Sequence, residues 1–389
     1  MDENPAFKVG DQLILQGSDF SELIVRLKAA AYRVVGPMVR DGCIVFDEIS
    51  GVEDLPAGFG DNQDAATYRL RQCDDMALFG YNNGPQSVKR FLYTPQREIW
   101  KARRNRKTVS IHLPDTEPVK TAFLGVRPCD LNAVLIQDRV FTRGEYLDDD
   151  YNKRRENSLI IVVNCTEAGK TCFCSSMNTG PRATAGFDLA LTEILHADHH
   201  YFLLEVGSDR GLSIVAGMPC DHASDQQLRT AAESVTRAAD NMGRSIDASG
   251  LKELLIRNID NVYWDSVGHR CLTCANCTMV CPTCFCSTVE DTTDLTGNTA
   301  HRIRRWDSCF TMDFSYIHGG SVRPSAKARY RQWIIHKLAS WHEQFGTSGC
   351  VGCGRCITWC PVGIDITEEA RAIRQRDIRP AEVSETMEV

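Results

Sequence analysis

Two stretches of the chain repeat one cysteine spacing: CLTCANCTMVCP at residues 271–282 and CVGCGRCITWCP at residues 350–361. In each stretch, three cysteines are separated by two residues each, a fourth follows after three more residues, and a proline comes directly after it. Three thiolates so close in the chain can surround one corner of a small inorganic cluster, whereas the fourth lies further along and points elsewhere. The doubled spacing therefore predicts two neighbouring sites that exchange their fourth ligand.

The same spacing is typical of bacterial ferredoxins that bind two 4Fe–4S clusters, where the fourth cysteine ligates the other cluster. We therefore expect two clusters, the first on Cys271, Cys274, Cys277 and Cys360, and the second on Cys350, Cys353, Cys356 and Cys281. The alternative is a pair of four-cysteine zinc sites. Such sites usually combine two C-x2-C pairs from separate segments, and three cysteines within seven residues fit that arrangement poorly.

Length, charge and cysteine content limit the class of protein. With 389 residues the chain can form two or three domains, and its net charge of −7 argues against a nucleic-acid partner. The first ten residues lack the features of a signal peptide, and no apolar run is long enough to cross a bilayer. We therefore expect a cytoplasmic protein without a membrane partner. In that compartment its 18 cysteines are expected to act as metal ligands and not to form disulfides.

The predicted fold class is α+β. Apolar segments at 121–126 and 158–163 indicate strands, a helical pattern covers 131–140, and further strands are predicted at 201–206 and 211–216. Such alternation favours a partly parallel sheet covered by helices. We expect a mixed α/β domain over residues 1–245 and a polar tail over 376–389. Between them, residues 246–375 are expected to form an α-helical, ferredoxin-like two-cluster domain with a long insertion at 282–349.

A second group of cysteines lies in the mixed domain. Cys129 and Cys165 follow the two apolar strands, and Cys172 and Cys174 form a C-x-C pair in the loop after Cys165. Functional groups collect at the carboxyl ends of strands in such sheets. The non-functional alternative is a set of reduced, half-buried thiols. A C-x-C pair in a surface loop is hard to explain by core packing, however. We therefore predict a third 4Fe–4S cluster here, with Cys220 as a possible substitute ligand.

The insertion contains further cysteines and a basic helix. Cys284, Cys286 and Cys309 are in it, and the sequence assigns them no role. The helix expected at about 325–344 carries Arg329, Arg331 and Lys337, which suggests a solvated face or a docking surface. The chain has no dinucleotide fingerprint and no P-loop, so we expect neither flavin nor nicotinamide to bind to it. No catalytic residue is expected either.

Three stretches together resemble one family: Arg127-Pro-Cys-Asp, Asn164-Cys with Cys172-Phe-Cys, and residues 271–286 with their Pro-Thr-Cys-Phe-Cys ending. It is the family of the beta subunit of cytoplasmic sulfhydrogenases, nickel–iron hydrogenases that use NAD(P). The equivalent subunit of anaerobic sulfite reductase is similar too. The resemblance runs from about residue 100 to about residue 370.

The resemblance implies a non-catalytic electron-transfer subunit in a hetero-oligomer. It implies that single electrons pass through 4Fe–4S clusters between a flavin subunit that binds NAD(P) and the small and large subunits of a nickel–iron hydrogenase. In an anaerobic sulfite reductase, a sirohaem subunit would take the place of the hydrogenase pair.

Two other classes of function remain open. One is an enzyme with an open iron site, for which Asp130 and Glu167 are candidate acid–base groups. The other is an iron–sulfur redox sensor, which would need an output module such as a DNA-binding helix pair. The sequence shows no such module.

Overall fold

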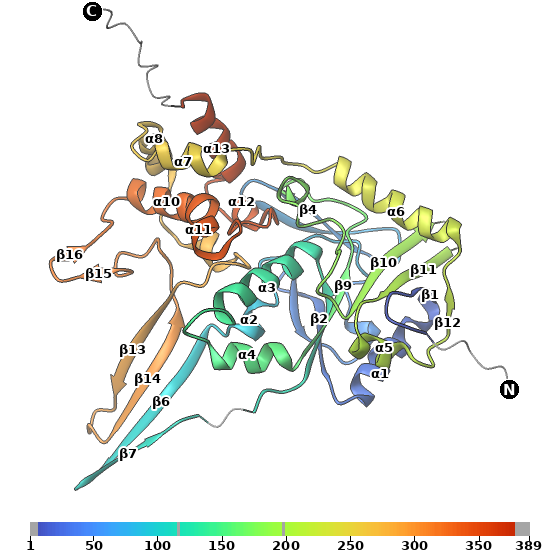
Figure 1. The fold of residues 1–389 in the computed structure, drawn as a ribbon, viewed down its shortest axis with the longest axis horizontal. Coiled ribbons are helices and arrows are strands. Elements are labelled where there is room, and N and C mark those ends of the chain that lie inside the picture. The colour runs from blue at the N-terminus through green and yellow to red at the C-terminus, as the bar shows by residue number, and fades with distance from the viewer. Residues whose placement is uncertain (1–6, 115–116, 197–198, 378–389) are drawn as a thin grey trace, which may run out of the picture.

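The computed structural model describes residues 7–114, 117–196 and 199–377 (Figure 1). Residues 378–389, most of the expected polar tail, lie outside this part. The largest element is an eight-stranded sheet. Its strands, in spatial order, are β12 (Cys220–His222), β1 (Gln12–Gln16), β11 (His199–Val206), β10 (Leu189–His196), β9 (Ser158–Val163), β8 (Thr121–Val126), β2 (Arg33–Arg40) and β3 (Cys43–Glu48).

The sheet is partly parallel, as the sequence predicts. Strand β8 pairs in parallel with β2 and β9, and β9 pairs in parallel with β10, whereas the outer pairs are antiparallel. Both β8 and β9 are buried at every position, as expected of central strands covered on two faces.

Alternating side chains of the central strands enter two different cores. In β9, Leu159, Ile161 and Val163 pack on one face with α1 (Phe20–Ala29) and α5 (Asp209–Val215). Ile160 and Val162 pack on the other face with α2 (Lys89–Leu92), α3 (Pro128–Phe141) and α4 (Asp149–Glu156). Helix α6 (Asp225–Asp240) covers β10 and β11 on this second face. The result is a sheet between two helical layers.

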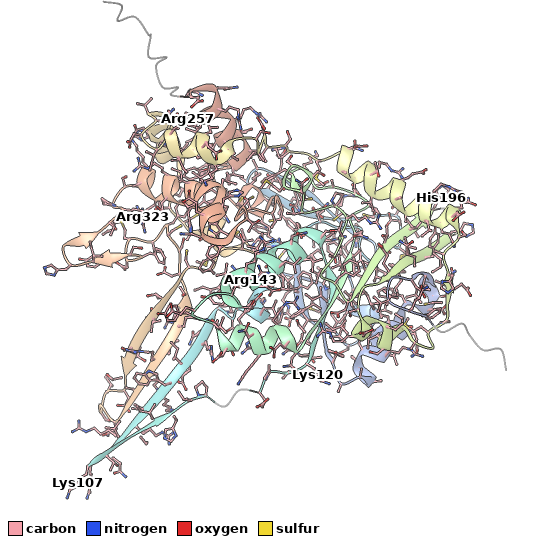
Figure 2. The ribbon with its side chains drawn as sticks, viewed as in Figure 1. Lys107, Lys120, Arg143, His196, Arg257 and Arg323 are labelled. Atoms are coloured by element: carbon pink, nitrogen blue, oxygen red, sulfur yellow. The ribbon has the colours of Figure 1, made fainter. Side chains whose placement is uncertain are left out.

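A four-stranded antiparallel sheet projects from the body as an arm, with Lys107 at its far end (Figures 1 and 2). Its order is β13 (Ser287–Thr293), β14 (Thr299–Trp306), β6 (Gln96–Asn105) and β7 (Thr108–His112). The expected insertion therefore supplies one hairpin, and the mixed domain supplies the other. Two small antiparallel ladders are β4 (Phe59–Asp64) with β5 (Thr67–Gln72) and β15 (Tyr316–Ile317) with β16 (Gly320–Ser321).

The remaining helices form a separate core around the cysteine runs. They are α7 (Leu251–Arg257), α8 (Tyr263–Arg270), α9 (Asn276–Met279), α10 (Ala326–Ile335), α11 (Trp341–Phe345), α12 (Arg355–Thr358) and α13 (Ile366–Gln375). A π-helical turn, His336–Ser340, joins α10 to α11. Trp264, Phe310, Trp333 and Ile357 lie in this core. Because few helices here are long, packing on this shared core is what holds them in place.

Two local predictions are wrong. Residues 211–216, expected as a strand, belong mostly to helix α5, because the Ser208 side chain caps it by accepting a hydrogen bond from the Gly211 amide. The basic helix is not a solvated face, since Arg329 and Lys337 are only 8% and 4% exposed. Within the described residues, no helix combines the length and apolar character that crossing a bilayer requires.

Candidate functional site

The two cysteine runs have the same local backbone shape. Thr273 and Ala275 in the first run have φ values of 53° and 68°, and Gly352 and Gly354 at the equivalent positions of the second run have 62° and 77°. Short helices then begin at Asn276 and Arg355. A left-handed residue on either side of the second cysteine curves the chain around a point, and this conformation is costly for any residue except glycine. The repeat in sequence is therefore a repeat in conformation.

This curvature turns backbone N–H groups toward the sulfurs. The amide of Thr273 lies 3.4 Å from Cys271 Sγ, and the amide of Gly352 lies 3.4 Å from Cys350 Sγ. The amide of Ile364 lies 3.3 Å from Cys360 Sγ. Such N–H···S hydrogen bonds favour the thiolate form and help to set the reduction potential of a bound cluster.

The first cavity is lined by all four cysteines expected to hold the first cluster. Its remaining walls are mainly apolar side chains. The cysteines are Cys271, Cys274, Cys277 and Cys360, and they are joined by Cys356, Phe310, Tyr330, Trp333 and Ile364. The first run and the last cysteine of the second run therefore meet in space.

The second cavity has the reciprocal composition. The four cysteines expected to hold the second cluster line it, namely Cys281, Cys350, Cys353 and Cys356, together with Phe173, Val351 and Lys337. Cys356 borders both cavities, so the two are immediate neighbours. The assignment of each cysteine as a ligand stays a prediction, but the fold groups the side chains as the spacing does.

The donor set fits a cluster better than a single ion. Among the described residues, no three or more histidine, cysteine or acidic side chains converge closely enough to hold one metal ion. The four cysteines of a 4Fe–4S cluster bind four different irons, so they surround a volume without meeting at one point. Burial raises the pKa of Cys277 and of Cys356 well above the ordinary thiol value. These thiols are therefore costly to ionise unless iron supplies positive charge.

Two buried lysines neutralise charge beside the second cavity. Lys337 Nζ lies 3.3 Å from Cys281 Sγ and 2.9 Å from the Gly349 carbonyl oxygen. Lys89 Nζ donates to the carbonyls of Cys281 and Cys284 at 2.7 and 3.0 Å. Burial lowers the pKa of Lys89, whereas neighbouring cysteines hold the pKa of Lys337 well above its usual value despite its burial. A buried ammonium needs a buried negative partner, and ligated thiolates provide one.

The third predicted group of cysteines lies beside the second cavity. Burial is the main cause of the raised pKa of Cys174, and the charges of Cys172, Cys165 and Cys353 add to it. Burial likewise raises the pKa of Cys129, with contributions from Asp130, Cys174 and Cys353. Cys172 Sγ is 4.0 Å from the Cys353 carbonyl oxygen. Cys129, Cys172 and Cys174 therefore lie near Cys353, and Cys165 lies on the side of Cys172 and Cys174.

The position of Cys220 does not suit the role of substitute ligand. It belongs to β12, at the edge of the large sheet, and β12 is separated from β9 by the three strands β1, β11 and β10. Strands are about 4.8 Å apart, so this separation is roughly 19 Å. Cys220 packs in the core beneath α1 and α5.

A buried ion pair connects the second run to the mixed domain. Arg355 lies between Cys353 and Cys356, and its guanidinium contacts both carboxylate oxygens of Asp130, at 2.6 and 2.7 Å. The two side chains are 1% and 0% exposed. Arg355 also donates to the Gly84 carbonyl at 2.8 Å. Helix α12 is thereby fixed against the start of α3, where Cys129 lies.

Neither acid–base candidate suits catalysis at a cluster. The carboxylate of Asp130 is fully engaged by Arg355. Glu167 is exposed, lies 3.9 Å from Arg71, and borders a wide groove with Arg127 and Glu193 rather than either cysteine cavity.

Sequence reasoning missed the contacts that charged residues make around the cysteines. Lys89 and Lys337 contact Cys281 from distant positions in the chain, and Arg355, which lies within the second run, contacts Asp130. One signal was present in the sequence, because an arginine within a cysteine run has no local acidic partner. Its partner, 225 residues away, could not be identified from spacing.

Comparison with known proteins agrees with this geometry. Residues 270–364 match the family model of a 4Fe–4S dicluster domain. The chain is 29% identical over 364 residues to the protein named sulfhydrogenase 2 subunit beta of Pyrococcus furiosus, a match that covers 93% of this chain and 98% of that protein. No solved structure matches the chain. The chain is therefore similar to a sulfhydrogenase beta subunit, and its residues 270–364 match a 4Fe–4S dicluster domain.

Proposed function

We propose that this chain relays single electrons through 4Fe–4S clusters inside a multisubunit hydrogenase. The observation that carries the proposal is the pair of cysteine cavities that share Cys356 as a common wall. Clusters in direct contact with the same residue are close enough to exchange electrons, and a pair of adjacent clusters is useful mainly for transfer. The similarity to a sulfhydrogenase beta subunit over nearly the whole chain supports the same role.

In this proposal, the ligand sets are those that line the cavities. Cys271, Cys274, Cys277 and Cys360 hold one cluster, and Cys350, Cys353, Cys356 and Cys281 hold the other. A third cluster on Cys129, Cys165, Cys172 and Cys174 would lie next to Cys353 and so extend the same row. The clusters supply reversible one-electron chemistry, and the protein supplies their surroundings.

The surrounding side chains control that chemistry in three ways. Phe310, Tyr330 and Trp333 exclude water from the first cavity. Backbone amides such as those of Thr273 and Gly352 donate to the sulfurs. Lys337 places a positive charge 3.3 Å from Cys281 Sγ, which stabilises the reduced, more negative state of the second site.

The proposed partners follow from electron counting. A nicotinamide delivers two electrons as a hydride, whereas a 4Fe–4S cluster accepts one, so a flavin must separate the pair. We place that flavin, with the NAD(P) site, on a partner subunit. We place the nickel–iron centre on small and large hydrogenase subunits, because eight cysteines that saturate two clusters leave no open iron for substrate.

The test is the bleaching of the broad iron–sulfur absorbance under anaerobic conditions. The isolated chain is expected to bleach with dithionite and to stay unchanged with NADH or NADPH. Addition of the flavin subunit is expected to restore reduction by the nicotinamide. Rapid bleaching of the single chain by NADPH would contradict the proposal, because it would mean that the chain binds a flavin itself. Nickel in the copurified complex, as opposed to sirohaem, identifies the catalytic partner.

A further inference from the structure

A third cavity is lined by cysteines that the cluster assignment does not use. Its volume is about 420 Å³, and Cys284, Cys286 and Cys309 form part of its wall together with His336, Lys337 and Trp341. The cysteines come from two segments, the Pro-Thr-Cys-Phe-Cys ending of the first run and the segment that follows β14. The cavity is far roomier than the two that hold the cluster cysteines.

The arm hairpin holds Cys286 and Cys309 together. Cys286 directly precedes β13, Ser287 pairs with Trp306 at the other end of the ladder, and Cys309 follows three residues later. The amide of Asp307 donates to the Cys286 carbonyl at 2.8 Å. The two thiols form a hydrogen bond with each other, and the Cys309 amide donates to the Cys286 sulfur. The contact is therefore fixed by backbone pairing, not by a flexible loop.

The geometry favours a pair of thiols over a further set of cluster ligands, because only two of the three cysteines contact each other. Cys284, the other cysteine of this cavity, is hydrogen-bonded instead to Cys281, at the second cluster site. Two thiols in contact, in a cavity large enough for water, have the arrangement needed to form an S–S bond.

The thiol pair also lies beside the proposed clusters. Cys309 is 8% exposed and belongs to the same core as Cys350, and Cys271, Cys277 and Cys356 pack against that core. The charge of Cys277 contributes to the raised pKa of Cys309. Electrons can therefore pass between this pair and the first cluster site over a short distance.

We propose that Cys286 and Cys309 form a dithiol–disulfide couple that exchanges two electrons with the neighbouring clusters; this rests on the proposed function of the clusters. In oxidation, the two S–H bonds break and one S–S bond forms. The two electrons leave one at a time, one to each of two oxidised clusters, and the two protons go to water in the cavity. Reduction is the reverse, with two reduced clusters as the electron source.

The electrostatic surroundings of the pair agree with this role. The pKa of Cys286 is lowered to about 7. The main cause is the hydrogen bond with Cys309, and the positive charge of nearby Lys337 contributes. The thiolate is the reactive form in thiol–disulfide chemistry. Part of Cys286 is therefore ionised at neutral pH, while Cys309 keeps its proton.

The experiment compares thiol states of the full chain, purified anaerobically and then either reduced with dithionite or oxidised with a dye mediator. After acid quench, alkylation and proteolysis, mass spectrometry is expected to find a disulfide between the Cys286 and Cys309 peptides only in the oxidised sample. In a dithionite titration, the oxidised wild type is expected to take up two more electrons per chain than Cys286→Ser or Cys309→Ser. Equal electron counts, or no disulfide in the oxidised wild type, would overturn the proposal.

Iron content separates this proposal from the alternatives. Cys286→Ser and Cys309→Ser are expected to keep the iron of the wild type, and a loss of about four irons in either would make the pair cluster ligands instead. Cys286 is half-buried, so its variant remains informative if Cys309→Ser does not fold. Cys220→Ser, which removes another buried thiol far from the cavity, should keep the disulfide. A wild type without iron would contradict the cluster assignment, whereas the disulfide analysis would still report on the pair.

Discussion

At the scale of single residues, the cysteine runs depend on their neighbours as much as on the thiols. A Cβ atom at Gly352 would lie 2.6 Å from the backbone of Phe173, and one at Gly354 would lie 2.5 Å from the carbonyl oxygen of Thr171. Both glycines also have positive φ values. The second run therefore needs glycine for conformation and for close packing on the C-x-C loop, whereas Thr273 and Ala275 accept the strained conformation in the first run.

The ligand assignment can be checked one cysteine at a time. Cys274→Ser is expected to remove the first cluster and Cys353→Ser the second, because each cysteine lines only one of the two cavities. Each variant should lose about four irons per chain and one of the characteristic paramagnetic signals on reduction. The matched control is Cys73→Ser, which removes a half-buried cysteine outside both cavities.

Loss of soluble protein is a further expected effect of both variants, since cluster assembly and folding of this small core are coupled. Anaerobic iron analysis and electron paramagnetic resonance measure the outcome. If both variants retained full iron and normal electron transfer, these cysteines would not be ligands.

At the scale of elements, the contact of α12 with α3 joins the dicluster domain to the large sheet. The contact is made by the ion pair between Arg355 and Asp130, both almost fully buried. The guanidinium also reaches Gly84 and Asn83, so its donors are satisfied by two segments of the chain. A buried pair of this kind adds little stability over apolar packing, but loss of one partner leaves an unpaired buried charge.

Asp130→Asn is therefore expected to destabilise the protein by about 3–5 kcal/mol. The reason is that Arg355 would keep its charge in a site without water. The control is Asp265→Asn, which removes the partner of Lys327 from an exposed pair at 2.9 Å and should cost about 0–1 kcal/mol. The measurement is the denaturant midpoint of the iron-loaded protein under anaerobic conditions.

A second variant tests the same explanation. Arg355→Met combined with Asp130→Leu removes both charges and should recover part of the lost stability. Equal destabilisation by the single and the double variant would show that the charge pair is not the cause.

At the scale of the whole molecule, the proposed metal sites form a row across the boundary between two cores. The first and second cavities share Cys356, and the third group of cysteines reaches from the sheet to Cys353. The insertion does not form a domain of its own, because its hairpin completes the arm with β6 and β7 and its helices complete the dicluster core.

A chain with three clusters should contain about twelve irons after anaerobic purification, and a chain with two should contain about eight. Cys172→Ser combined with Cys174→Ser is expected to lower iron to about eight and to leave the two dicluster signals in place. Cys220→Ser is the control, because this buried cysteine lies on the edge strand β12, which three strands separate from β9. A wild type with only about eight irons under strict anaerobiosis would contradict the third cluster.

Cysteine spacing and apolar periodicity were enough to predict the dicluster domain and the central strands. The two repeated cysteine runs are recognised from their spacing, and β8 and β9 are recognised from continuous apolar runs. Which charged residues lie beside the cysteines follows from the folded chain and not from local sequence. Arg355 meets Asp130 over 225 residues of chain, and Lys337 is buried because the cysteine segments fold over it. Local sequence patterns predict local secondary structure, whereas contacts between residues distant in sequence depend on how the chain packs. The contact between Cys286 and Cys309 is of this second kind.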